Sequence, residues 1–166
     1  MASGDTLLTF TALSDEAPNA AFATLDVRNG HSVLDFDAAS DEEAVFGGVL
    51  PRHYSGLGIT VRVAWMASSA IAGTCRWQGA FERHDDEGSD LDSDSFAGFQ
   101  SAGASAPATN GAVQYTDIVF TDGAQIDGLL ATESFRFKLR RDADKTSGTD
   151  DMLGDAELLR IEFRES

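Results

Sequence analysis

The segment from Ile59 to Met66 alternates between apolar and polar or small side chains. Ile59, Val61, Val63 and Trp65 share one parity, and Thr60, Arg62 and Ala64 share the other. Successive side chains of an extended strand point to opposite faces, so this pattern predicts a strand with one buried face. A helix would spread the same apolar residues around its axis. The chain must therefore bury one face of a sheet.

Three further segments repeat this alternation: Thr74 to Arg83, Ser134 to Arg141 and Leu159 to Arg164. The inward parity in these segments belongs to Cys75, Trp77, Gly79, Phe81, Phe135, Phe137, Leu139 and Phe163. The outward parity belongs to Arg136, Lys138 and Arg140. Weaker strands are predicted at Phe22 to Arg28, Ser32 to Phe36, Ala44 to Leu50, Val113 to Thr121 and Ala124 to Leu130.

Glycine-containing turns separate the predicted strands, among them Asn29-Gly30, Asn110-Gly111 and Asp122-Gly123. About eight short strands without a convincing amphipathic helix favour an all-β fold. The sequence therefore predicts an antiparallel β-sandwich of the jelly-roll kind. About one helical turn is expected at Ser40 to Ala44, where Ser40 and Glu43 have the spacing of a capping box.

Three segments fall outside the strand pattern. Residues 1–20 contain one apolar piece, Leu7 to Leu13, and are expected to form an N-terminal arm that docks on a neighbour or frays. Residues 21–166 then form the sandwich domain. Within the domain, residues 100–112 read as a loop of small residues and residues 142–155 as an acidic loop.

The charge balance is strongly acidic: 12 Lys and Arg residues stand against 28 Asp and Glu residues in 166, a net charge of -16. Such a surface repels phosphate backbones and anionic lipids, so we expect neither a nucleic-acid nor a membrane partner. The N-terminus lacks the basic region and apolar run of a signal peptide, and no apolar run approaches the roughly 18 residues of a membrane span.

The densest acidic stretch, Asp85 to Asp94, places Asp90, Asp92 and Asp94 at alternate positions, as in the first half of a calcium loop. Ser95 and Ser101 stand where an EF-hand needs Gly and a bidentate Glu, so that motif fails. These three aspartates are weak calcium candidates, and a solvated turn is the simpler interpretation. Arg140 and Arg141 directly precede the acidic loop 142–155. They are expected to form surface ion pairs with the aspartates of this loop, worth roughly 0–1 kcal/mol each.

No catalytic or cofactor motif is present. The histidines His31, His53 and His84 lie beside predicted turns without metal-ligand spacing, and we expect them to be exposed. Cys75 is the single cysteine and has the inward parity of its strand, which favours a core residue over a nucleophile. The sequence predicts no cofactor, no catalytic residues and no enzyme activity.

Four aromatic side chains could form a platform for a sugar ring: Trp65, Trp77, Tyr54 and Tyr115. Both tryptophans have inward parity, so core packing explains them better. Tyr54 follows a proline in a predicted turn, and we expect it to be exposed.

Parts of the sequence resemble small β-rich proteins of tailed bacteriophages, several of which are jelly-roll decoration, or cement, proteins. The resemblance rests on LDFDAASDEEAVFGGVLPRHYSGLGITVRVAWMA (34–67), FERHDDEGSDLDSDSFA (81–97) and FRFKLRRDADKTSGTDDMLGDAELLRIEFRES (135–166), roughly half of the chain. These are strand and turn phrases that bring no functional residues with them, and residues 1–20 lie outside the resemblance.

The resemblance implies a virion protein on the capsid surface, made in the cytoplasm of a bacterial host. It implies a homotrimer whose partner is the major capsid protein and whose role is to stabilise the phage head. Two alternatives remain open from the residues: a head-fibre, tail or receptor-binding component of a virion, and a carbohydrate- or calcium-binding β-sandwich module.

Overall fold

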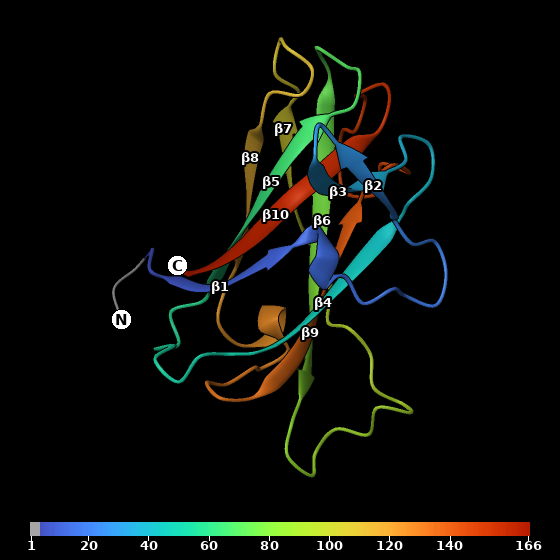
Figure 1. Cartoon of the computed structure of the whole chain (residues 1–166). Coiled ribbons are helices and arrows are strands. Elements are labelled where there is room, and N and C mark those ends of the chain that lie inside the picture. The colour runs from blue at the N-terminus through green and yellow to red at the C-terminus, as the bar shows by residue number, and fades with distance from the viewer. Residues whose placement is uncertain (1–3) are drawn as a thin grey trace.

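A computed structural model describes residues 4–166 as two packed antiparallel sheets (Figure 1). Sheet A has the strand order β2-β3-β10-β5-β8, with β1 also paired to β10, and sheet B has the order β4-β9-β6-β7. The strands are β1 (Thr6–Thr11), β2 (Thr24–Arg28), β3 (His31–Phe36), β4 (Glu43–Val49), β5 (Ile59–Ala67), β6 (Thr74–His84), β7 (Gln100–Ser105), β8 (Gln114–Phe120), β9 (Ser134–Arg141) and β10 (Ala156–Glu165). The predicted β-sandwich is confirmed.

The core lies between the inner faces of the two sheets, as the alternation predicts. Phe36 of β3 meets Trp77 of β6 edge to face, with ring centroids 4.9 Å apart. Phe81 packs against four further rings, those of Phe120, Phe135, Phe137 and Phe163. A β-carbon at Gly79 would lie 2.6 Å from the Phe137 ring, so glycine at this position makes room for the cluster. Edge-to-face pairs add to the stabilisation that burial of their apolar surface supplies.

Three local predictions are wrong. Ala124–Ile126 forms a 3₁₀ turn, η2, instead of part of a strand, and Ser40 to Ala44 is not helical because β4 begins at Glu43. Residues 100–112 include β7, which pairs with β6 from Thr74↔Ser105 to Gly79↔Gln100. The segment QSAGAS has no large apolar side chain, so its strand depends on main-chain pairing that hydrophobic periodicity does not reveal.

The N-terminal residues that were predicted to form an arm belong to the sandwich in this structure, apart from residues 1–3, which lie outside the described range. β1 pairs with β10, and a second 3₁₀ turn, η1 (Ala12–Ser14), follows it. Phe10 packs against Phe46 and Phe163, with ring centroids 5.7 and 5.6 Å away. No helix among residues 4–166 is long and apolar enough to cross a membrane.

Arg141, at the end of β9, is fully buried instead of lying in a surface ion pair. Its Nε and Nη2 donate to the two carboxylate oxygens of Asp150 at 3.0 and 2.7 Å. Nη2 also donates to the carbonyl of Met152, and Nη1 donates to the carbonyl of Gly154, both at 2.8 Å. The expectation for Arg141 is wrong because the acidic loop folds over the end of the sandwich and removes the pair from water. Arg140 lies 3.4 Å from Asp41 at the surface.

Replacing Arg141 with Met should lower the free energy of unfolding by about 3–5 kcal/mol, because Asp150 would remain as an unpaired buried charge. Urea unfolding followed by circular dichroism measures this loss. Arg140→Gln on the same strand is the control and should cost at most about 1 kcal/mol. Equal losses in the two variants would show that the buried pair is not a main source of stability.

Asp35 of β3 is placed where its negative charge is unfavourable. It lies beside Glu157 in the register of β3 and β10, and its Oδ1 is buried without a hydrogen-bond partner among residues 4–166. Burial, reinforced by Glu157, Asp26, Asp155 and Glu42, raises the pKa of Asp35 to about 6. The folded state therefore holds this proton more tightly than the unfolded chain, and the contribution of Asp35 to stability declines as the pH rises from about 4 to about 6.

Asp35→Asn should raise the melting temperature at pH 7 by about 2–4 °C and leave it almost unchanged near pH 3.5. Differential scanning calorimetry at the two pH values tests this, with the exposed Asp94→Asn as a control. A rise of the same size at both pH values would show that the gain does not come from removing the charge.

Candidate functional site

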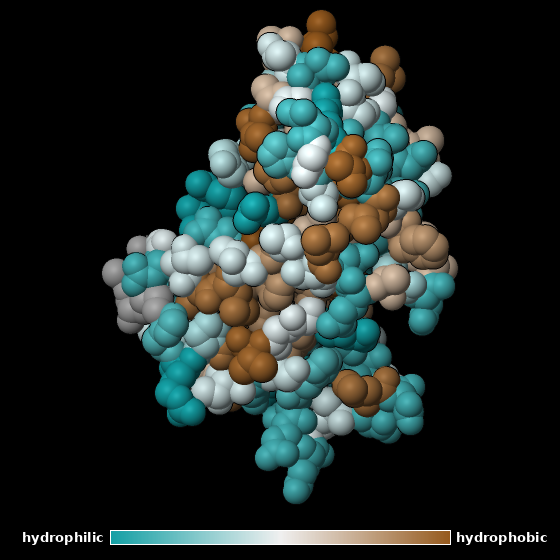
Figure 2. Space-filling view, viewed as in Figure 1, coloured by the Kyte–Doolittle hydropathy of each residue, from teal (hydrophilic) through white to brown (hydrophobic). Residues whose placement is uncertain are grey.

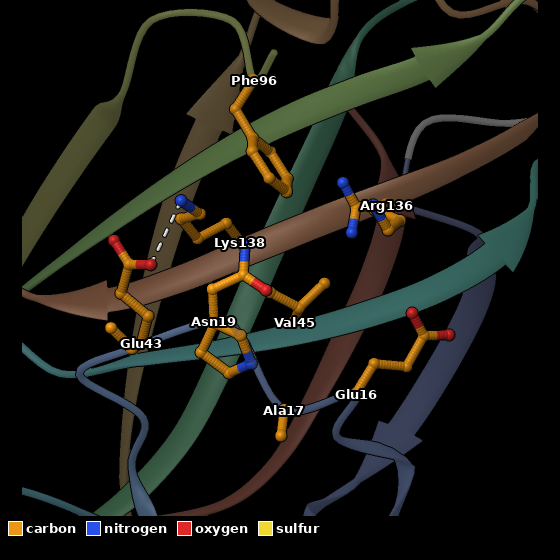
Figure 3. Close-up of a pocket in the computed structure, with 10 residues that line it drawn as sticks. Glu16, Ala17, Asn19, Glu43, Val45, Phe96, Arg136 and Lys138 are labelled. Atoms are coloured by element: carbon orange, nitrogen blue, oxygen red, sulfur yellow. Dashed lines mark ion pairs between the residues drawn. The ribbon is translucent and has the colours of Figure 1, made fainter. Parts of the chain in front are cut away.

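A hollow of about 410 Å³ lies on the outer face of sheet B, over β4 and β9 (Figure 3). Because Phe135, Phe137 and Leu139 of β9 point into the core, the intervening Arg136 and Lys138 point outward and line the hollow. Glu43 and Val45 of β4 complete the floor. The alternation of the two strands thus places charged and apolar groups side by side on the floor of an open hollow.

One wall of the hollow is the segment 16–20, which approaches the outer edge of β4. Asp15 Oδ1 accepts the amide of Val45 at 2.9 Å, and the amide of Glu16 donates to the carbonyl of Val45 at 2.7 Å. Further on, Ala23 and Glu43 are joined by a main-chain hydrogen bond of 2.9 Å. The wall is therefore held at both ends by bonds to the strand that forms the floor.

Phe96, from the long loop between β6 and β7, forms the opposite wall. The Lys138 Nζ atom lies 4.5 Å from the centroid of the Phe96 ring, and the Arg136 guanidinium carbon lies 5.3 Å from it. The loop is tied down next to this ring, where the amide of Ala97 donates to the carbonyl of Phe81 at 2.8 Å. Cation–π contacts of this kind hold the ring over the basic side chains.

The two basic groups of the hollow are themselves fixed by carboxylates. Lys138 Nζ lies 3.1 Å from Glu43, the pair drawn dashed in Figure 3. Arg136 Nε donates at 2.9 Å to Glu82, which is almost fully buried. Donors and acceptors with fixed positions beside an aromatic ring are the features that bind a ligand rich in hydroxyl groups.

A second hollow of about 320 Å³ continues along the same face. It shares Glu16 and Arg136 with the first hollow and is lined further by Gly47, Gly48, Val49, His84, Ser134 and Phe135. We call the two hollows together the sheet B channel. Because the two hollows adjoin at Glu16 and Arg136, together they offer more room to a chain of linked units than either offers alone.

A competing hollow of about 340 Å³ lies on the outer face of sheet A. Tyr115 lines it with a side chain that is 58% exposed, and the Arg62 guanidinium carbon lies 5.3 Å from the centre of its ring. Figure 2 shows that apolar side chains on the visible face form separate clusters bounded by hydrophilic ones. Because the sheet A hollow also has an exposed aromatic ring beside an arginine, it serves as a matched surface against which the sheet B channel can be tested.

The aromatic residues considered from the sequence have mixed positions. Trp65 and Trp77 are fully buried, which confirms them as core residues. The expected exposure of Tyr54 is wrong: its hydroxyl donates to Asp122 at 2.9 Å and accepts the amide of Gly58 at 3.1 Å. Burial and the bond to Asp122 raise the pKa of Tyr54. No local pattern in the sequence indicates that Phe96 lies over β9, because the contact joins a loop to a strand about 40 residues away along the chain.

The acidic candidates Asp90, Asp92 and Asp94 lie in an exposed turn, where Asp90 accepts the amide of Asp92 at 3.1 Å and Asp94 that of Ser95 at 2.8 Å. Their role as weak calcium candidates stays a prediction. Within residues 4–166, the group of three side chains whose carboxylate oxygens all lie within 4.8 Å of one another is that of Asp41, Asp142 and Asp144.

Asp142 already has several hydrogen-bond donors from the protein. Burial opposes its ionisation, but donors from Ser147 and Thr146 outweigh this effect and lower its pKa. Its oxygens are thus satisfied within the acidic loop, and this carboxylate cluster is explained as a structural turn.

The remaining candidates do not meet. His31 and His53 are exposed, whereas His84 is half-buried and lies 3.0 Å from the hydroxyl of Ser134. Cys75 is fully buried, and burial raises the pKa of its thiol, which confirms it as a core residue.

Comparison with known proteins identifies the fold and no family. No protein-family model matches the chain, and no curated protein matches it. Among solved structures, the C-terminal CBM6 of LamC, a marine laminarinase from Zobellia galactanivorans, is similar with a TM-score of 0.53 and 13% identity over 95% of this chain and 98% of that chain.

Two xylan-binding modules show a similar likeness. The CBM22-2 xylan-binding domain of Paenibacillus barcinonensis Xyn10C has a TM-score of 0.50 and 11% identity over 92% of both chains. The xylan-binding module CBM15 has a TM-score of 0.50 and 9% identity over 96% of this chain and 97% of that chain. At such identities the likeness establishes a shared β-sandwich fold.

Proposed function

We propose that this protein is a carbohydrate-binding β-sandwich module that binds an extended saccharide in the sheet B channel without chemical conversion. The observation that carries the proposal is the channel itself, in which Phe96, Arg136 and Lys138 are held in fixed positions above the sheet. Sugars offer hydroxyl groups for such donors and acceptors, and apolar ring faces for an aromatic wall. The similarity of the fold to carbohydrate-binding modules supports the same class of ligand.

Phe96→Ala should weaken binding of the preferred hexasaccharide by at least about tenfold, because it removes the aromatic wall that packs over Lys138 and Arg136. Isothermal titration calorimetry with cellohexaose, xylohexaose and laminarihexaose measures the effect. Tyr115→Ala is the matched control, since it removes an exposed aromatic ring with a cation–π partner from the opposite sheet. If Tyr115→Ala abolished binding while Phe96→Ala did not, the site would be the sheet A hollow.

The virion role stays a prediction that rests on the resemblance of residues 34–67, 81–97 and 135–166. We keep a phage decoration protein, with the major capsid protein as partner and a homotrimer as its form, as a second proposal. It is compatible with saccharide binding, because a module displayed on a particle is well placed to meet surface glycans. Gold-labelled antibody on particles from the source tests it: label over the heads is the expected result, and its absence from particles would reject the virion role.

A further inference from the structure

The charged groups along the sheet B channel do not cancel. Lys138 is paired with Glu43 and Arg136 with Glu82, so neither cation carries an uncompensated charge. Glu16 also lines the channel, and none of the ion pairs found among residues 4–166 includes its carboxylate. With Glu82 counted as the partner of Arg136, one negative charge on the channel is left uncompensated, that of Glu16.

Glu16 occupies the position where the two hollows join. It lines both of them, together with Arg136, and Figure 3 shows the two side chains at the same end of the first hollow. A β-carbon at Gly47 would lie 2.4 Å from Glu16 Oε1. Glycine on the outward-facing side of β4 thus leaves the space in which this carboxylate rests on the channel floor. A chain that fills both hollows must pass it.

We propose that the sheet B channel selects uncharged saccharide chains and that Glu16 is the residue that excludes anionic ones. The inference rests on the proposed function and adds the charge class of the ligand and a specificity residue. A carboxylate or sulfate on the ligand would meet the unpaired charge of Glu16 at close range. It would gain little from Arg136 and Lys138, because it would have to displace Glu82 or Glu43 from them.

A channel that prefers anionic chains would behave differently from one that excludes them. If Arg136 and Lys138 released their carboxylate partners on binding, the same channel would attract anionic chains. The two possibilities differ in the response to removing the charge of Glu16 alone, because that charge is not part of either ion pair.

The experiment uses cellohexaose or laminarihexaose and the same hexasaccharide with its primary alcohols oxidised to carboxylates. Calorimetry at about 20 mM and about 200 mM NaCl compares the full chain with Glu16→Gln and with Glu87→Gln. Glu87 is an exposed glutamate outside the residues that line the channel, so its replacement removes one charge without changing the site. Circular dichroism verifies that each variant is folded.

We expect the unmodified protein to bind the neutral chain at least about tenfold more tightly than its oxidised form at low salt. Glu16→Gln should strengthen binding of the oxidised chain about fivefold, and the gain should shrink at the higher salt. Glu16→Gln should bind the neutral chain with an affinity within about twofold of that of the unmodified protein. Glu87→Gln should change the affinity for either ligand by no more than about twofold.

Equal or tighter binding of the oxidised chain by the unmodified protein would overturn the inference and leave the proposed function in place. So would a Glu16→Gln variant that behaves like Glu87→Gln. If the folded protein bound none of cellohexaose, xylohexaose and laminarihexaose, the proposed function itself would be rejected.

Discussion

The buried ion pair of Arg141 and Asp150 is the interaction that joins the separate parts of this sandwich. Arg141 ends β9 in sheet B, and its guanidinium reaches the carbonyls of Met152 and Gly154 in the segment that leads to β10 of sheet A. Asp150 accepts the amide of Arg76 from β6 at 2.9 Å as well as the two bonds from Arg141. A buried charge requires nearly complete pairing, so these bonds fix the path of the acidic loop and the position of one end of both sheets.

The aromatic core has a direct consequence for the outer face. Since the rings of Phe135 and Phe137 fill the interior, β9 presents Arg136, Lys138 and Arg140 outward. Their carboxylate partners come from β6, from β4 and from Asp41 in the loop before β4. Three basic residues on one strand of a strongly acidic protein are thus neutralised by their neighbours. The result is a polar surface of low net charge with fixed hydrogen-bonding groups, which is unlike the acidic loops around it.

The segment between β1 and β2 has two roles in the structure. Its bonds to Val45 and Glu43 satisfy main-chain groups on the free edge of β4, which would otherwise be open to pairing with another sheet. The same segment raises a wall beside β4 and carries Glu16 over Gly47. Protection of an edge strand and the shape of the channel therefore have one cause, the route by which the chain passes from sheet A to sheet B and back.

The sequence by itself determined the fold class, the four clearest strands and which of their apolar side chains enter the core, because an apolar alternation of period two has few other solutions. It also fixed the outward direction of Arg136 and Lys138. Only the tertiary structure decided that β7 is a strand, that Tyr54 and Arg141 are buried, and that Phe96 and Glu16 meet the outer face of sheet B. These features come from loops and main-chain pairing between segments far apart in sequence, and such contacts leave no local periodic signal. The candidate site belongs mostly to this second class, since β4 and β9 supply its floor but loops supply its walls.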